Sequence, residues 1–147
     1  MNPEAFTKNL MMHRVPLHDL LDKIPEGKEE TKAHDEGMSI AQTAFHILMS
    51  AERTAARLTG AEMQKPDPEM SFAEIKTALK ANTETLKTEL PGLTAEQLSS
   101  MVEAFGGQMP LSALLNIFKD HEVHHKGQLW TLARVADVEP GLMMKFG

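Results

Sequence analysis

Apolar residues along the chain recur every three to four positions, which is the period of an α-helix. Four segments follow this pattern, over about 3–24, 39–59, 71–90 and 111–136. The stretches between them are rich in charged residues, proline or glycine. The pattern predicts an all-α protein, and four helices joined by one long crossover connection predict a four-helix bundle.

Local signals mark where the helices begin and end. Two helices are predicted to begin at capping boxes, Ser39–Gln42 and Ser71–Glu74, in which the first and fourth residues satisfy each other's backbone donors. Gly60 and the pair Pro91-Gly92 are predicted to end these helices. Pro16 lies inside the first helical pattern, so we expect it to kink or divide that helix.

The connections differ in length and character. Residues 25–38 are charged and predict a solvated loop. Residues 93–110 have no sustained helical period, although Thr94 can begin a short turn and 101–109 can be extended across Gly106-Gly107. We predict that 93–110 is the crossover connection, and connections of this length are often functional.

Composition narrows the classes of function. The 147 residues fit a single domain spanning 1–147. The net charge of −6 disfavours nucleic-acid binding, and the lack of cysteine excludes disulfides, thiolate zinc sites and a cysteine nucleophile. No signal peptide and no apolar run of the ~20 residues that span a bilayer is visible. We therefore expect a cytoplasmic protein that does not enter membranes.

The candidate chemistry lies in the histidines. There are seven, and three of them fall in the run His121–His125. Residues four apart on a helix share a face, so His121 and His125 can reach one ion. That face is predicted to point into the bundle, with Glu122 and Lys126 on the opposite side. Its apolar members are Leu114, Ile117, Phe118, Leu129 and Leu132.

Two neighbouring buried imidazoles favour a metal ion over an inert core. Each needs hydrogen-bond partners, and the two have no simple way to satisfy each other. A shared ion resolves both, and histidine is the commonest ligand of zinc and similar metals. The alternative is a hydrogen-bonded core pair, because this spacing without a middle glutamate is only moderately specific.

A third ligand must come from elsewhere in the chain. His46 falls on a polar stripe of the second helix, which fits a solvated histidine or one lining a wet cleft between helices. His13 lies between apolar positions of the first helix and is the rival, although we favour it as a core residue or one that orients a ligand. His18 and His34 are predicted to be surface residues.

Two segments resemble the DinB/YfiT-like superfamily. The segment Asp120–Leu129 resembles the signature of its last helix, with two histidines four apart followed by a basic residue, Gly and Gln. The segment Ser39–Ile47 resembles the start of its second helix, with a capping serine and one histidine about seven residues on. The resemblance implies an up-down-down-up bundle, usually dimeric, with a divalent ion, often zinc or nickel, held by His46, His121 and His125.

The resemblance also suggests a reaction. Characterised relatives include transferases and isomerases that activate a low-molecular-weight thiol, so we expect a thiol or water to attack a small electrophile as substrate, in a transferase or hydrolase reaction. No catalytic residue is assigned, although Glu52 and Gln128 are candidates by proximity.

Two other functions remain open. In one, His13, His124 or a carboxylate completes the coordination, and the chain is a non-catalytic metal-binding, ligand-binding or stress-response protein. In the other, it is a structural homodimer whose histidines are remnants. Some of its 11 methionines suit a helix–helix interface, in particular Met11, Met12 and Met49.

Overall fold

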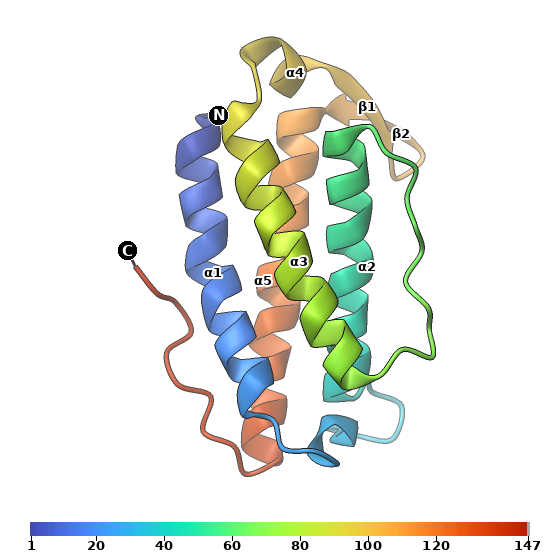
Figure 1. Cartoon of the computed structure of the whole chain (residues 1–147), viewed down its shortest axis with the longest axis vertical. Helices are drawn as coiled ribbons and strands as arrows, with labels where there is room; N and C mark the ends of the chain where they lie inside the picture. Colours follow the sequence, from blue (N-terminus) through green and yellow to red (C-terminus); the bar gives the residue numbers. More distant parts are fainter. Residues whose placement is uncertain (147) are drawn as a thin grey trace.

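Each segment with helical periodicity forms one long helix in the computed structural model, which describes residues 1–146. The helices lie side by side along the long axis of the molecule (Figure 1). The prediction of an all-α four-helix bundle is confirmed. The long helices are α1 (Pro3–Lys23), α2 (Ile40–Thr59), α3 (Phe72–Glu89) and α5 (Leu111–Val135).

The four helices form a square in which α1 and α2 occupy opposite corners. Both α1 and α2 pack against α3 and against α5. Helices α2 and α3 run in one direction and α1 and α5 in the other, so the order is up-down-down-up (Figure 1). Two consecutive parallel helices need a connection that spans the bundle, and residues 60–71 supply it. The prediction that 93–110 is the crossover is therefore wrong.

Residues 90–110 instead stay at one end of the bundle (Figure 1). They form η2 (Leu90–Gly92), α4 (Ala95–Ser99) and an antiparallel hairpin of β1 (Met101–Ala104) and β2 (Gly107–Pro110). The turn places Phe105 at φ 54° and Gly106 at φ 76°, which suits a tight hairpin. The prediction of an extended segment around the two glycines is confirmed.

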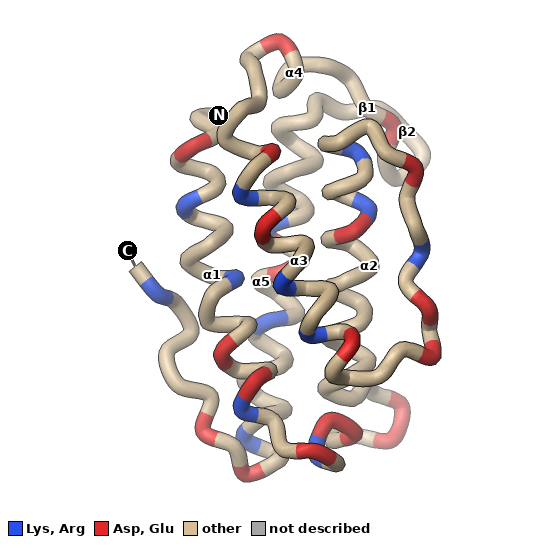
Figure 2. Tube along the Cα trace, viewed as in Figure 1, with Lys and Arg blue, Asp and Glu red and all other residues tan. Residues whose placement is uncertain are grey.

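Residues 24–39 form the loop that joins α1 and α2 at the other end, as the charged segment predicts. It contains the single-turn η1 (Lys28–Glu30). Acidic residues gather in this loop, at the end of the bundle opposite the hairpin (Figure 2).

Pro16 does not divide the first helix, because α1 is continuous. A proline removes the N–H that would bond the carbonyl four residues earlier, here that of Met12. That carbonyl instead accepts a hydrogen bond from the backbone N–H of Lys145, at 3.1 Å. The C-terminal tail therefore satisfies the backbone group that the proline leaves open.

Both predicted capping boxes are present. Ser39 accepts from the backbone of Gln42, whose side chain accepts from Ser39 N–H, and Ser71 and Glu74 pair in the same way. These reciprocal bonds satisfy donors at the starts of α2 and α3.

Removing a cap should cost measurable stability. We expect Ser39→Ala and Ser71→Ala each to lower the free energy of unfolding by about 1 kcal/mol. Urea denaturation followed by circular dichroism measures this loss. Thr131→Ala, at an exposed site about one turn before the end of α5, is the control and should not destabilise. Equal stability of the cap variants and the control would contradict the capping role.

The apolar core is divided into two halves along the bundle. One cluster contains Leu17, Ile47, Leu79 and Leu129, and the other contains Leu10, Ala51, Leu86, Leu115 and Phe118, among others. On α1, α3 and α5 the buried residues between the two clusters include the polar side chains of Arg14, Asn82, Thr83 and Glu122. A polar layer therefore crosses the middle of the bundle.

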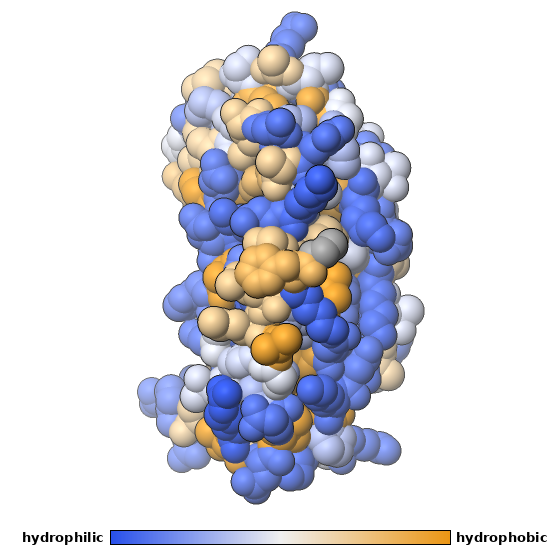
Figure 3. All heavy atoms as spheres, turned by 90° about the vertical axis from the view of Figure 1, so that its left-hand side faces the viewer, coloured by the Kyte–Doolittle hydropathy of each residue, from blue (hydrophilic) through white to orange (hydrophobic). Residues whose placement is uncertain are grey.

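The C-terminal tail lies along the outside of the bundle beside α1 (Figure 1). Its side chains Leu142, Met143 and Phe146 are exposed, as is Val15 on α1. Figure 3 shows apolar surface on this side of the molecule, between polar regions above and below it.

Candidate metal centre

His46, His121 and His125 converge between α2 and α5, which are neighbours in the square. Nε2 of His46 lies 2.9 Å from Nε2 of His121, and the ring centroids of the three residues lie 4.5–4.9 Å apart. One ligand atom from each residue lies within 4.8 Å of the others. His46 thus meets His121 from a position 75 residues away in the sequence, whereas His121 and His125 are one turn apart on the same helix.

The protonation state of these rings favours a cation. Burial, together with the neighbouring His125, lowers the pKa of both His46 and His121 below the ordinary value of 6.5. At neutral pH these rings are therefore uncharged, and an uncharged imidazole has a lone pair that binds a metal. The ring nitrogen Nδ1 of His121 is also buried without a hydrogen-bond partner among residues 1–146.

Gln128 orients one of the three rings. Its Oε1 lies 2.7 Å from Nδ1 of the buried His125, which therefore donates the bond. This hydrogen bond fixes the tautomer and leaves Nε2 of His125 as the free lone pair. Gln128 is thus the proximity candidate that does contact the histidines. The other, Glu52, faces α3 and accepts a hydrogen bond from Asn82 at 3.2 Å.

The two other candidate ligands lie outside this group. Nδ1 of His13 lies 2.8 Å from Nζ of Lys126, so the lone pair of His13 is already used. The exposed His124 packs edge-on against His125, with centroids 4.9 Å apart, but its Nε2 is directed to Gln128 at 3.4 Å. Among residues 1–146, the histidine cluster that can hold an ion consists of His46, His121 and His125.

His34 is exposed, as predicted, but the prediction that His18 is a surface residue is wrong. Nε2 of His18 lies 2.7 Å from Oγ1 of Thr83, which donates its own proton to the Leu79 carbonyl and accepts from Arg14. His18 therefore donates through Nε2, while its Nδ1 is buried without a partner. Burial and the Arg14 charge lower the pKa of His18 to about 4.

This shift makes stability depend on pH. The unfolded chain binds a proton at His18 below about pH 6.5, whereas the folded chain does so only near pH 4. The stability gained from burying the uncharged His18 is therefore fully present above pH 6.5 and is lost as the pH falls toward 4. Between pH 7 and pH 5 we expect the wild type to lose about 1–2 kcal/mol more of its unfolding free energy than His18→Gln, after allowance for partial exposure. Denaturation at both pH values measures the difference.

His34→Gln is the matched control for this experiment, because His34 is exposed. It should keep the pH dependence of the wild type. A His18→Gln variant with an unchanged pH dependence would show that His18 is not the group responsible.

Glu122 and Lys126 are buried, so the prediction that they lie opposite the core is wrong. The reason is that α5 packs on α1 as well as on α2, which makes its buried arc wider than one stripe. His121 and His125 lie on the edge that faces α2, and Glu122 lies on the edge that faces α1. Ile117, predicted to be in the core, is 40% exposed beside the histidine edge.

The polar layer centres on a buried ion pair behind the histidines. Arg14 is fully buried and binds both carboxylate oxygens of Glu122, at 2.5 and 2.9 Å. Its remaining nitrogen donates to Asn82 and Thr83 on α3. Because Glu122 directly follows His121, the layer and the candidate centre occupy the same level of the bundle.

Lys126 anchors the C-terminal tail. Its ammonium donates to His13 and to the Met143 carbonyl and lies 5.4 Å from the centroid of the Trp130 ring. Burial lowers its pKa to about 8, so it remains mostly protonated at neutral pH. The lysine that follows His125 therefore holds the tail against α1 and α5 rather than facing the histidines.

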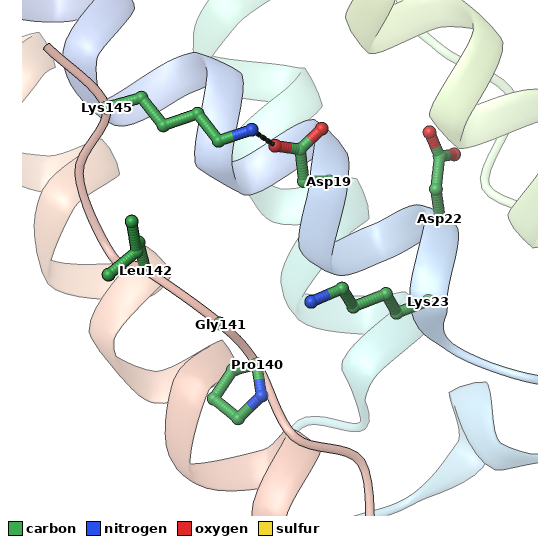
Figure 4. Close-up of a pocket in the computed structure, with 7 residues that line it drawn as sticks. All are labelled: Asp19, Asp22, Lys23, Pro140, Gly141, Leu142 and Lys145. Carbon is green, nitrogen blue, oxygen red and sulfur yellow. Dashed lines mark ion pairs between the residues drawn. The ribbon is translucent and has the colours of Figure 1, made fainter.

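A separate hollow of about 360 Å³ lies between the end of α1 and the tail. Figure 4 shows its acidic and basic side chains, including the ion pair of Lys145 with Asp19 at 2.5 Å. None of the three converging histidines lines it. Its lining residues are Asp19, Asp22, Lys23, Pro140, Gly141, Leu142 and Lys145.

Comparison with known proteins decides the family. The model of the DinB family matches residues 2–144. The chain belongs to the DinB family. The chain is also similar along most of its length to the uncharacterized protein YjoA of Bacillus subtilis (strain 168). The two are 29% identical over 131 residues, which cover 86% of this chain and 85% of the relative.

Solved structures of DinB-like proteins share this fold. The crystal structure of the DinB-like protein YjoA from Bacillus subtilis gives a TM-score of 0.81 at 25% identity and covers 96% of this chain and 99% of its own. A DinB-like protein from Bacillus cereus gives 0.79 at 22% identity, covering 97% and 99%. The family assignment and the bundle therefore agree with the resemblance of the two histidine segments. No helix among residues 1–146 is long and apolar enough to cross a membrane.

Proposed function

We propose that this chain binds one divalent metal ion through His46, His121 and His125 and uses it in a reaction on a small electrophile. The observation that carries the proposal is the convergence of three imidazoles from two helices, with the pKa values of His46 and His121 lowered by burial. Nitrogen ligands favour zinc, nickel and similar ions over calcium or magnesium, which prefer oxygen.

The chain's own residues define what such a site does. When bound, the ion supplies Lewis acidity, because three uncharged ligands leave it its full charge and lower the pKa of a coordinated thiol or water. Gln128 holds the His125 ring in the tautomer that presents Nε2. His46 is exposed, so the site is open to solvent on the α2 side and a small molecule can reach it.

The cluster formed by residues 1–146 contains three ligands and no fourth, which favours catalysis over closed binding. His13 is engaged with Lys126 and Glu52 with Asn82, so neither completes the coordination in this arrangement. Within residues 1–146 the cluster consists of three ligands. Three protein ligands leave a position for an exchangeable molecule, as in catalytic rather than structural zinc sites.

Metal analysis and cobalt spectroscopy test the proposal. The protein is purified without a nickel column and its metal content is measured, with about one equivalent expected. The ion is then replaced by Co²⁺, and the visible spectrum is followed while 2-mercaptoethanol is added. We expect new sulfur-to-cobalt absorption, since a thiol should enter the open position.

The possible outcomes separate the two functional classes. A cobalt spectrum that does not respond to the thiol or to pH would contradict catalysis and leave a metal-binding role. Failure of the protein to bind any divalent ion would contradict the proposal as a whole.

A further inference from the structure

The edge of α2 that faces α5 carries a second functional group beyond His46. Arg53 follows His46 by seven residues, which is about two helical turns and nearly the same direction around the axis. Ser50 lies between them, one turn beyond His46, and is half-buried. The opposite edge of α2 faces α3, as the bond between Glu52 and Asn82 shows. His46, Ser50 and Arg53 therefore form one line along the α5 side of α2.

Among residues 1–146, Arg53 is the arginine whose guanidinium makes neither a hydrogen bond nor an ion pair. The chain has four arginines. Arg14 pairs with Glu122, Arg57 donates to the Glu103 carbonyl, and Arg134 lies 3.9 Å from Glu139. Among residues 1–146, the exposed Arg53 makes no ion pair.

The facing surface of α5 is apolar. Helices α2 and α5 are antiparallel (Figure 1), and the contact of His46 with His121 fixes their alignment. Moving from His46 toward Arg53 on α2 therefore corresponds to moving from His121 back to Ile117 and Leu114 on α5. Ile117 is exposed and Leu114 is half-buried. We call His46, His121 and His125 the histidine triad. The surface strip beside it thus has a cationic edge at Arg53 on α2 and an apolar edge at Ile117 and Leu114 on α5. None of these edge positions carries a carboxylate.

We propose that Arg53 is a specificity-determining residue that binds a carboxylate of the substrate while the substrate's reacting group lies at the histidine triad. This inference rests on the proposed function, since it assumes that the triad is where the substrate reacts. The substrate class is a carboxylate joined to its reacting group by a short apolar chain, which lies along Leu114 and Ile117.

A carboxylate matches this strip better than a phosphate. The planar guanidinium binds a carboxylate through two parallel hydrogen bonds. Arg57, one turn further along α2, already donates to the Glu103 carbonyl. That leaves the Arg53 guanidinium and the Ser50 hydroxyl to balance a single negative charge, whereas the dianion of a phosphate monoester needs more donors. In a chain of net charge −6, an unpaired arginine beside the triad also gives anions a local site that most of the surface does not offer.

The spacing sets the length of the ligand. The Cα atoms of His46 and Arg53 are about 10 Å apart along the helix. Both side chains extend from the helix, so a chain of about five or six carbons joins the triad to the guanidinium. Two matched probes of this length are 6-mercaptohexanoate and 6-mercaptohexan-1-ol, which share a thiol and a carbon chain and differ in charge at the far end.

The test compares binding of these two thiols to the cobalt-loaded protein, followed by the cobalt absorption. We expect the wild type to bind the carboxylate probe roughly tenfold more tightly than the alcohol, as for one hydrogen-bonded charge pair. In Arg53→Gln this preference should fall to about unity, with the affinity for the alcohol unchanged. Arg134→Gln removes the same charge from an exposed site near the end of α5 and should keep the preference.

The outcomes distinguish this inference from the proposed function. Equal affinity for the two thiols in the wild type, or equal loss of preference in Arg134→Gln and Arg53→Gln, would overturn the role of Arg53 alone. If neither thiol changes the cobalt spectrum, thiol coordination is wrong. Hexanoate and hexanol, with binding followed by calorimetry in the same variants, then decide the role of Arg53 by the same criteria.

Discussion

Glu122→Ala should lower the free energy of unfolding by about 3–5 kcal/mol, the largest effect on stability that we expect from a single substitution in this chain. The substitution leaves the Arg14 guanidinium fully buried without its counter-charge. Asn82 and Thr83 satisfy one nitrogen of Arg14 but supply no negative charge. Urea denaturation followed by circular dichroism measures the loss.

Two further variants test whether the unpaired charge of Arg14, rather than another effect of the substitution, causes the loss of stability. Glu84→Ala removes an exposed carboxylate that pairs with Lys87, and it should change the unfolding free energy by less than about 1 kcal/mol. The double variant Arg14→Met/Glu122→Leu removes both charges and should recover most of the stability lost by Glu122→Ala. A double variant as unstable as Glu122→Ala would show that lost packing, rather than the unpaired charge, is the cause.

His125→Ala should abolish binding of the divalent ion. The ring of His125 is the most buried of the three and the one held by Gln128, so its loss removes the best-oriented ligand. Bound metal stabilises a folded protein by about 4 kcal/mol when its concentration is a thousand times the dissociation constant. The thermal shift produced by Zn²⁺ or Ni²⁺ in the wild type should therefore disappear in this variant, and calorimetry should detect no binding.

Matched histidine substitutions test the rest of the ligand set. His34→Ala should retain the thermal shift, because His34 is exposed and outside the cluster. His46→Ala should lose most of the shift, whereas His13→Ala should keep it. If His46→Ala retains full occupancy and His13→Ala loses it, the third ligand is assigned to the wrong helix.

The sequence predicts those parts of the fold that depend on local interactions. The capping boxes at Ser39 and Ser71 are present because each is complete within four consecutive residues. The pairing of His121 with His125 follows from helix geometry for the same reason. His46 could not be assigned from periodicity alone, because its nearness to His121 depends on which helices are neighbours. The resemblance of two short segments supplied that information.

The errors concern residues whose environment is created by distant segments. Pro16 is tolerated within α1 because the tail residue Lys145 donates to the carbonyl that the proline leaves open. Glu122 is buried because Arg14, 108 residues away, supplies its counter-charge. His18 is held by Thr83, 65 residues away. A helical wheel takes no account of such partners and therefore places Glu122 and Lys126 on the wrong side of α5.

The polar layer fixes the position of α5 along its own axis relative to α1. Apolar side chains tolerate sliding of one helix along another, since one leucine can replace the next in the same hole. Arg14 and Glu122 do not, because a slip of one turn, about 5.4 Å, would separate the two charges inside the core. The same slip would carry His121 and His125 away from His46. One ion pair on the α1 side of the helix therefore sets the register in which the histidines on its α2 side meet their partner.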